Sequence, residues 1–221
     1  QGVERGVAAA ARPQDNDYVL QCRRQHPARI HAAVRLDPRD PGALLAFTES
    51  VSAGACGLLL DPLAQGFADA DPALTGPLAE AAGTLDAMVL VNCRPALGLS
   101  SVEGAMRLAY EHPGTAFILL HAAAQRFADL QPVAAEPGAA RWRSFFVDLS
   151  DTAVRLRHSP FWEQFRWTMR ELGARHLVFG SGWPAGDIGV TVQAVHDLGF
   201  SAEEERMIFR ENMAALLDRR G

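Results

Sequence analysis

Short apolar runs alternate with helix-like segments along the whole chain. Seven of these runs are typical of strands, and several are apolar on both faces, as in a parallel sheet that is covered on both sides. They are Val3–Ala10, Ile30–Leu36, Cys56–Leu60, Ala87–Asn92, Ala116–Ala122, Ser144–Leu149 and His176–Ser181. This alternation predicts one α/β domain built from repeating strand–helix units.

The segments between these runs carry helix signals. Pro41–Ser52 has a proline in its first turn, where its missing N–H costs nothing. The last helical segment opens with a capping box at Ser201 and Glu204. Five helices are predicted, over Asp15–His26, Pro41–Ser52, Ser101–Glu111, Phe161–Leu172 and Ser201–Leu217. The stretch Gln125–Arg143, rich in Ala, Pro and Arg, is expected to form a long loop.

The helical connections between parallel strands are almost always right-handed. A repeating strand–helix chain with such connections forms either a doubly wound open sheet or a (β/α)8 barrel. The glycine-rich GxGxxG motif does not follow the first strand, and the sequence holds no phosphate-binding loop motif. We therefore favour a (β/α)8 TIM-type barrel. Since seven strands are one short of a closed barrel, we expect residues 1–221 to form a single barrel domain whose first strand precedes Gln1.

Composition narrows the function classes. The chain is 48% hydrophobic and 21% charged with a net charge of −5, which is too apolar for a disordered chain. All 21 basic residues are arginines, so lysine-based Schiff bases and carboxylated-lysine metal bridges are excluded. The three cysteines are far apart in the sequence, so they encode neither a disulfide framework nor a zinc knuckle. The basic residues form no continuous stripe of the kind that binds nucleic acid. We expect a cytoplasmic protein that binds a small molecule, with no nucleic-acid or membrane partner.

Ligands of parallel α/β folds bind at the carboxyl ends of the strands. Several polar or glycine residues stand at those ends in this sequence. They are Asp61, Asn92, Arg94, His121, Asp148 with the nearby Ser150 and Asp151, Gly182 and the adjoining Trp183. Asp187, a little further on, is expected to be either a loop turn residue or a cap for the helix that starts near Ile188.

Several segments, in this order and spacing, resemble the amidohydrolase-related family, also called amidohydrolase family 2. The segments that carry the resemblance are Gly54–Leu58, His112–His121, Phe146–Ser150, Phe179–Pro184 and Glu211–Leu217. The resemblance implies a (β/α)8 barrel that acts as a metal-dependent hydrolase or decarboxylase. In that family, an HxH pair on the first strand, histidines ending the fifth and sixth strands, and an aspartate after the last strand form the metal site.

The chain departs from that pattern at most of these places. It holds no HxH pair, Asn92 stands at the fifth-strand histidine position, and Gly182 stands at the aspartate position. Only His121 matches a family ligand, and one imidazole is too few for a zinc site. We expect a single divalent metal, zinc, if an HxH pair precedes Gln1, and otherwise none.

Each candidate also has a structural reading. His121 is either a metal ligand or a hydrogen-bonded strand-end residue, and Asp148 either a catalytic acid or a loop anchor. Asn92, Arg94 and Trp183 are expected to line the pocket. We predict an amidohydrolase-like hydrolase or decarboxylase of a small carbonyl or carboxylate compound, with a degraded metal site and altered or weak activity. The alternative is a non-catalytic barrel for ligand binding or subunit interaction, and a homodimer is a further expectation from the resemblance.

Overall fold

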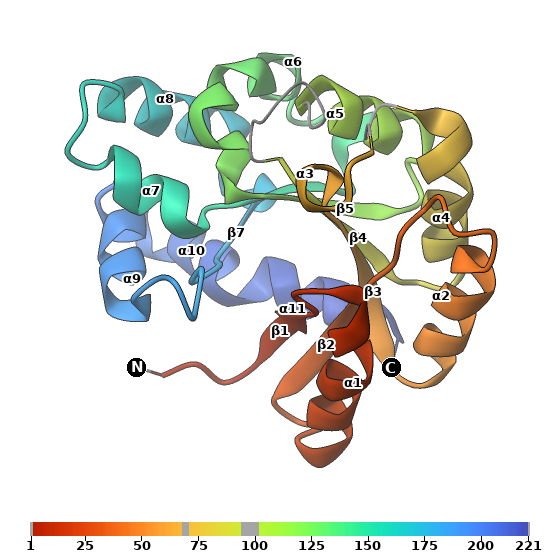
Figure 1. The fold of residues 1–221 in the computed structure, drawn as a ribbon. Helices are drawn as coiled ribbons and strands as arrows, with labels where there is room; N and C mark the ends of the chain where they lie inside the picture. Colours follow the sequence, from red (N-terminus) through yellow and green to blue (C-terminus); the bar gives the residue numbers. More distant parts are fainter. Residues whose placement is uncertain (1, 68–70, 94–101, 221) are drawn as a thin grey trace.

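The computed structural model describes residues 2–67, 71–93 and 102–220. In this part of the chain, seven parallel strands form one curled sheet whose strand order is the chain order (Figure 1). The strands are β1 (Gly6–Ala9), β2 (Ile30–Arg35), β3 (Ala55–Leu60), β4 (Met88–Asn92), β5 (Ala116–Leu120), β6 (Phe145–Asp148) and β7 (Leu177–Val178). Each strand pairs with the next in parallel register, which is the connectivity of a TIM-type barrel wall.

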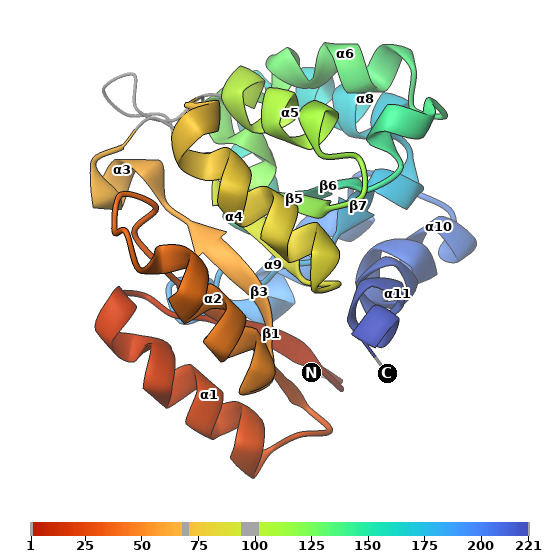
Figure 2. The ribbon, with the colours of Figure 1, turned by 90° about the vertical axis from the view of Figure 1, so that its right-hand side faces the viewer.

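Helices follow the strands and cover the outer face of the sheet. Figure 2 shows α1, α2, α4 and α5 succeeding one another across that face. The longer helices are α1 (Asn16–Gln25), α2 (Ala43–Ser52), α4 (Pro72–Thr84), α5 (Val102–Glu111), α8 (Trp162–Leu172) and α9 (Ile188–His196). The shorter ones are η1 (Pro13–Asp15), α3 (Pro62–Gln65), η2 (His121–Leu130), α6 (Gln131–Ala135), η3 (Ala140–Trp142), α7 (Ser150–Leu156), η4 (Ala174–His176), α10 (Ala202–Arg206), η5 (Met207–Glu211), α11 (Asn212–Leu217) and η6 (Asp218–Arg220). Within the described ranges, none of these helices has the length and apolarity needed to cross a bilayer.

The seven predicted strands and the predicted barrel class are confirmed, with ends shifted by a few residues. The prediction of a long loop over Gln125–Arg143 is wrong, because this stretch contains η2, α6 and η3. Phe127, Leu130 and Ala134 are buried at positions i, i+3 and i+7, which is the spacing of one face of a helix. The apolar face was therefore present in the sequence, but the composition of the segment was taken as typical of a loop.

The sheet separates two apolar layers. The larger layer lies between the sheet and the outer helices and includes Phe47, Phe117 and Phe165, all fully buried. The smaller layer fills the inside of the curl, where Leu216 and Leu217 of α11 pack against side chains from the strands. The strand side chains of this inner layer include Ala33, Leu59, Leu90, Ile118, Phe146 and Val178.

Candidate active site at the carboxyl ends of the strands

Polar residues succeed the inner apolar layer at the carboxyl end of the curled sheet. Because successive side chains of a strand point to opposite faces, the residue two positions beyond an inner residue also points inward. Counting two positions on from Ala33, Leu59, Leu90, Phe146 and Val178 gives Arg35, Asp61, Asn92, Asp148 and Gly180. These positions define the mouth of the barrel, which is where ligands of this fold class bind.

Arg35 and Asp61 form a buried ion pair on one side of the mouth. Arg35 Nη2 lies 2.7 Å from Asp61 Oδ2, and the two residues are 8% and 5% exposed. The other carboxylate oxygen of Asp61 accepts a hydrogen bond from Ala64 N–H and caps α3. The pair thus ties the ends of β2 and β3 together. Arg35 was not among the residues predicted from the sequence, although the period of two from Ala33 was available to find it.

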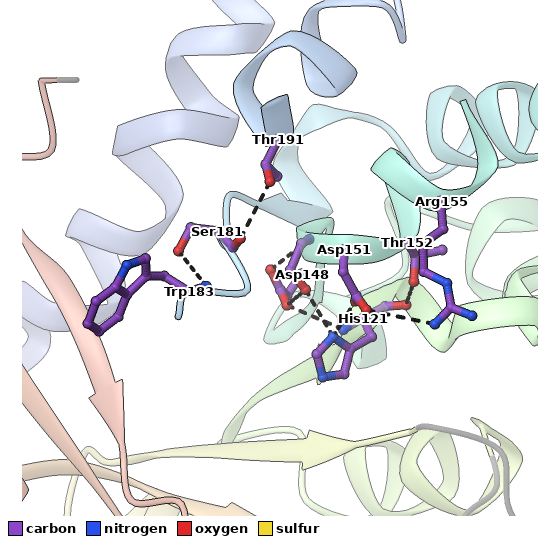
Figure 3. A network of polar contacts seen from close by, with 9 residues as sticks. His121, Asp148, Asp151, Thr152, Arg155, Ser181, Trp183 and Thr191 are labelled. Carbon is purple, nitrogen blue, oxygen red and sulfur yellow. Dashed lines mark hydrogen bonds and ion pairs between the residues drawn. The ribbon is translucent and has the colours of Figure 1, made fainter. Parts of the chain in front are cut away.

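His121 and Asp151 form a hydrogen-bonded pair on the opposite side of the mouth (Figure 3). His121 Nδ1 lies 2.6 Å from Asp151 Oδ1 and 3.1 Å from Ser150 Oγ. Since a carboxylate only accepts hydrogen bonds, this contact places a ring proton on Nδ1, so that in the neutral ring the lone pair is on Nε2. Figure 3 shows the second ring nitrogen turned away from the carboxylates, and no described residue is hydrogen-bonded to it.

Asp148 lies behind this pair and is almost fully enclosed. It is 6% exposed, and its carboxylate accepts hydrogen bonds from Ser150 N–H, Ser150 O–H and His121 N–H at 3.1, 2.7 and 3.3 Å. Burial raises the pKa of Asp148, against the opposing effect of the bonds from Ser150. Gly180 packs directly on the carboxylate, because a Cβ at this position would lie 2.0 Å from Oδ1.

The remaining predicted residues are spread around the mouth. Asn92 ends β4 and is half-buried, and Arg94 lies outside the described residues. Gly182 has φ +65°, and an added Cβ would meet nothing closer than 3.8 Å, at Asp151 Cβ. Trp183 is 71% exposed in the loop after β7. Of the two roles expected for Asp187, the helix cap is confirmed, since its carboxylate accepts a 3.0 Å bond from Val190 N–H at the start of α9.

The described residues at this mouth do not by themselves supply the donors of the family's metal site. Nowhere in residues 2–67, 71–93 and 102–220 do three His, Cys, Asp or Glu side chains form a group that could hold an ion. Gly182 offers no donor atom, and Nδ1 of His121 is already bonded to Asp151. Because a zinc site needs at least three protein ligands, no chemical step is assigned to a metal here.

The amidohydrolase family model matches residues 1–219, nearly the full chain. The chain belongs to the amidohydrolase family. No curated protein matches it significantly. The confirmed family membership agrees with the resemblance found in the motifs around His121, Asp148 and Gly182.

Several solved structures have the same fold as this chain. A putative 2-pyrone-4,6-dicarboxylic acid hydrolase from Pseudomonas putida is 23% identical with a TM-score of 0.73, over 97% of this chain and 82% of that one. An uncharacterised TIM-barrel protein from Bordetella bronchiseptica is 16% identical with a TM-score of 0.79, over 100% and 79%. A dihydroxybenzoic acid decarboxylase from a Polaromonas species, with bound manganese and an inhibitor, is 15% identical with a TM-score of 0.69, over 93% and 74%. At these identities the likeness establishes the fold.

Proposed function

We propose that this chain acts on a small carbonyl or carboxylate compound at the mouth of its barrel, by hydrolysis or decarboxylation. His121 is the proton-transfer group, and Asp151 orients it. The observation that carries the proposal is the 2.6 Å contact between His121 Nδ1 and Asp151 Oδ1, which leaves Nε2 to a ligand in the mouth. Asn92 and Gly182, which stand where the family resemblance expects a histidine and an aspartate, support an activity that is altered or weak relative to other family members.

The geometry of the pair suits proton transfer. In a hydrolysis, Nε2 of His121 would accept a proton from the attacking water, and Asp151 would stabilise the resulting imidazolium. In a decarboxylation, the protonated form of His121 would donate its Nε2 proton to the carbon that loses carbon dioxide, and the ring would take up a new proton from solvent. The side chains of His121 and Asp151 are 15% and 26% exposed, so the pair is partly desolvated but open on one side.

The structural neighbours suggest the compounds to test. Two of them are named for a pyrone dicarboxylate and a dihydroxybenzoate, which are both planar rings with carboxylate groups. Purified protein is incubated with 2-pyrone-4,6-dicarboxylate or 2,6-dihydroxybenzoate, after EDTA treatment and after addition of Zn²⁺ or Mn²⁺. Loss of the lactone absorbance and release of carbon dioxide report the two reactions. We expect turnover of at least one compound without added metal.

A matched pair of variants tests the role of His121. His121→Asn should lower kcat/KM by about 10²–10⁴-fold, the usual contribution of a general base. His196→Asn is the control, because His196 makes the same kind of contact with Glu205, Nδ1 to Oε1 at 2.8 Å, on the surface. Equal losses in both variants, or turnover that survives in His121→Asn, would refute the assignment.

A non-catalytic ligand-binding barrel is the second candidate. The observation in its favour is that Gly182 and Asn92 stand where the family resemblance expects an aspartate and a histidine. Isothermal titration calorimetry with the same two carboxylates separates the candidates. Binding without turnover in every metal condition supports the binding protein and overturns the enzyme.

A further inference from the structure

The chain turns left-handed directly after β5. His121, Ala122, Ala123 and Ala124 have φ values of 63°, 44°, 57° and 50°. Non-glycine residues adopt this region at a cost in free energy, because Cβ crowds the following carbonyl oxygen. Ala122 and Ala123 are fully buried, so surrounding contacts must hold this turn in place.

Two side chains from the β6–α7 segment hold the backbone of His121. Asp148 Oδ2 accepts a 3.3 Å bond from His121 N–H, and Thr152 Oγ1 donates a 2.5 Å bond to His121 C=O. Asp148 and Thr152 are 6% and 4% exposed, so water competes little for either bond. The N–H and C=O groups of His121 are thus fixed by two residues of one rigid segment.

The same segment also reaches the ring of His121. Ser150 Oγ donates to Asp148 Oδ2 at 2.7 Å and lies 3.1 Å from His121 Nδ1. Asp151, the next residue, accepts the hydrogen bond from Nδ1–H. Asp148 therefore acts on His121 in two ways, directly through the backbone and through Ser150 on the imidazole.

We propose that Asp148 and Thr152 are positioning residues that impose the left-handed turn and thereby present His121 with Nδ1 toward Asp151 and Nε2 toward the mouth. The inference rests on the proposed function in taking His121 as the proton-transfer group. A merely structural role would stabilise the fold without determining which ring nitrogen carries the proton. The two roles differ in a property of the folded protein that can be measured without substrate.

The test is the tautomer of His121 in Asp148→Asn and Thr152→Val. Nitrogen NMR of uniformly ¹⁵N-labelled full chain, at one pH where the ring is neutral, reports which nitrogen bears the proton. His121 is assigned among the seven histidines by the signal missing in His121→Asn. Thr115→Val is the matched control, because Thr115 is also buried, at 3% exposure, and donates a 2.9 Å bond to Ala79 C=O.

We expect the Nδ1–H tautomer in the wild type and in Thr115→Val, and a substantial Nε2–H fraction in Asp148→Asn and Thr152→Val. An unchanged tautomer in folded Thr152→Val and Asp148→Asn would overturn the positioning role. If Asp148→Asn does not fold, Thr152→Val and Ser150→Ala decide the question by the same signal. A changed tautomer with unchanged turnover would support the positioning role of Asp148 and Thr152 and refute His121 as the proton-transfer group. Failure of the positioning role can therefore be distinguished from failure of the proposed function.

Discussion

Gly180 and Asp148 are so close that a single methyl group tests their packing. A Cβ added at Gly180 would lie 2.0, 2.8 and 3.1 Å from Oδ1, Cγ and Oδ2 of Asp148, and these are its three nearest atoms. The backbone of Gly180 is outside the left-handed region, so an alanine there brings no conformational strain of its own. The whole effect of Gly180→Ala is therefore expected to pass through the carboxylate.

The size of the effect follows from these distances. To restore a contact of about 3.5 Å, the carboxylate must move by about 1.5 Å, which breaks at least one of its hydrogen bonds. Overpacking costs about 1–3 kcal/mol, and a buried polar group left without its partner costs about 1–3 kcal/mol more. We expect Gly180→Ala to lower the free energy of unfolding by about 3–5 kcal/mol, a large part of the ~5–15 kcal/mol of a typical domain.

A double-mutant cycle isolates this contact. Asp148→Ala removes all three clashing atoms, so adding Gly180→Ala to that variant should cost less than about 1 kcal/mol, and the coupling should be about 2–4 kcal/mol. The assay is urea unfolding followed by circular dichroism. Gly138→Ala is the control, because its added Cβ would meet no atom within 4 Å. If Gly180→Ala lowered the free energy of unfolding equally in the wild type and in Asp148→Ala, the clash with the Asp148 carboxylate would be refuted as the cause.

Three further predictions concern the backbone, pH and charge. Ala124 has φ 50° and ψ −120°, which glycine adopts readily, so Ala124→Gly should raise the free energy of unfolding by about 1 kcal/mol, whereas Ala46→Gly inside α2 should lower it by about 1 kcal/mol. Burial and the nearby arginine charges lower the pKa of His31 in the folded protein. As pH falls, the unfolded chain therefore binds a proton at His31 at a higher pH than the folded chain does. The wild type should therefore lose stability relative to His31→Asn as pH falls from 8 to 5.5, and equal urea midpoints of the pair across that range would contradict this. At pH 8, Gly182→Asp should destabilise the protein more than Gly182→Asn, because the new carboxylate stands beside Asp151, whereas equal losses in the two variants would exclude charge as the cause.

The architecture was predictable because the residues that pack in the inner and outer apolar layers recur at regular spacings along the sequence. Each buried strand is a short apolar run, and each covering helix carries caps or an apolar stripe. The segment over η2 and α6 was predicted as a loop from its Ala, Pro and Arg content, although Phe127, Leu130 and Ala134 are spaced as one face of a helix and Pro132 lies in the first turn of α6. In this segment the spacing of the apolar residues was a better guide to secondary structure than composition.

The placement of the candidate residues at the ends of the strands was predictable from the sequence, whereas their contacts with one another were not. His121, Asp148 and Gly182 were found because they end strands within recognisable motifs. Asp151 was placed with Asp148 among the polar residues at the strand ends, but its contact with His121 was not predicted, because that contact depends on the left-handed turn at 121–124, and alanines do not signal such a turn. A pair formed across thirty residues by an unusual backbone cannot be read from spacing alone.

Gly182 and the His121–Asp151 pair are physically consistent with each other. The Cβ that an aspartate at 182 would add lies 3.8 Å from the Cβ of Asp151, so its carboxylate would be a near neighbour of the Asp151 carboxylate. Two carboxylates at that separation repel unless a cation lies between them, and the repulsion would weaken the hold of Asp151 on Nδ1. With glycine at 182, this repulsion is absent, and Asp151 holds the imidazole at 2.6 Å. Glycine at 182, where the family resemblance expects an aspartate, is therefore compatible with the proposed proton transfer through the His121–Asp151 pair.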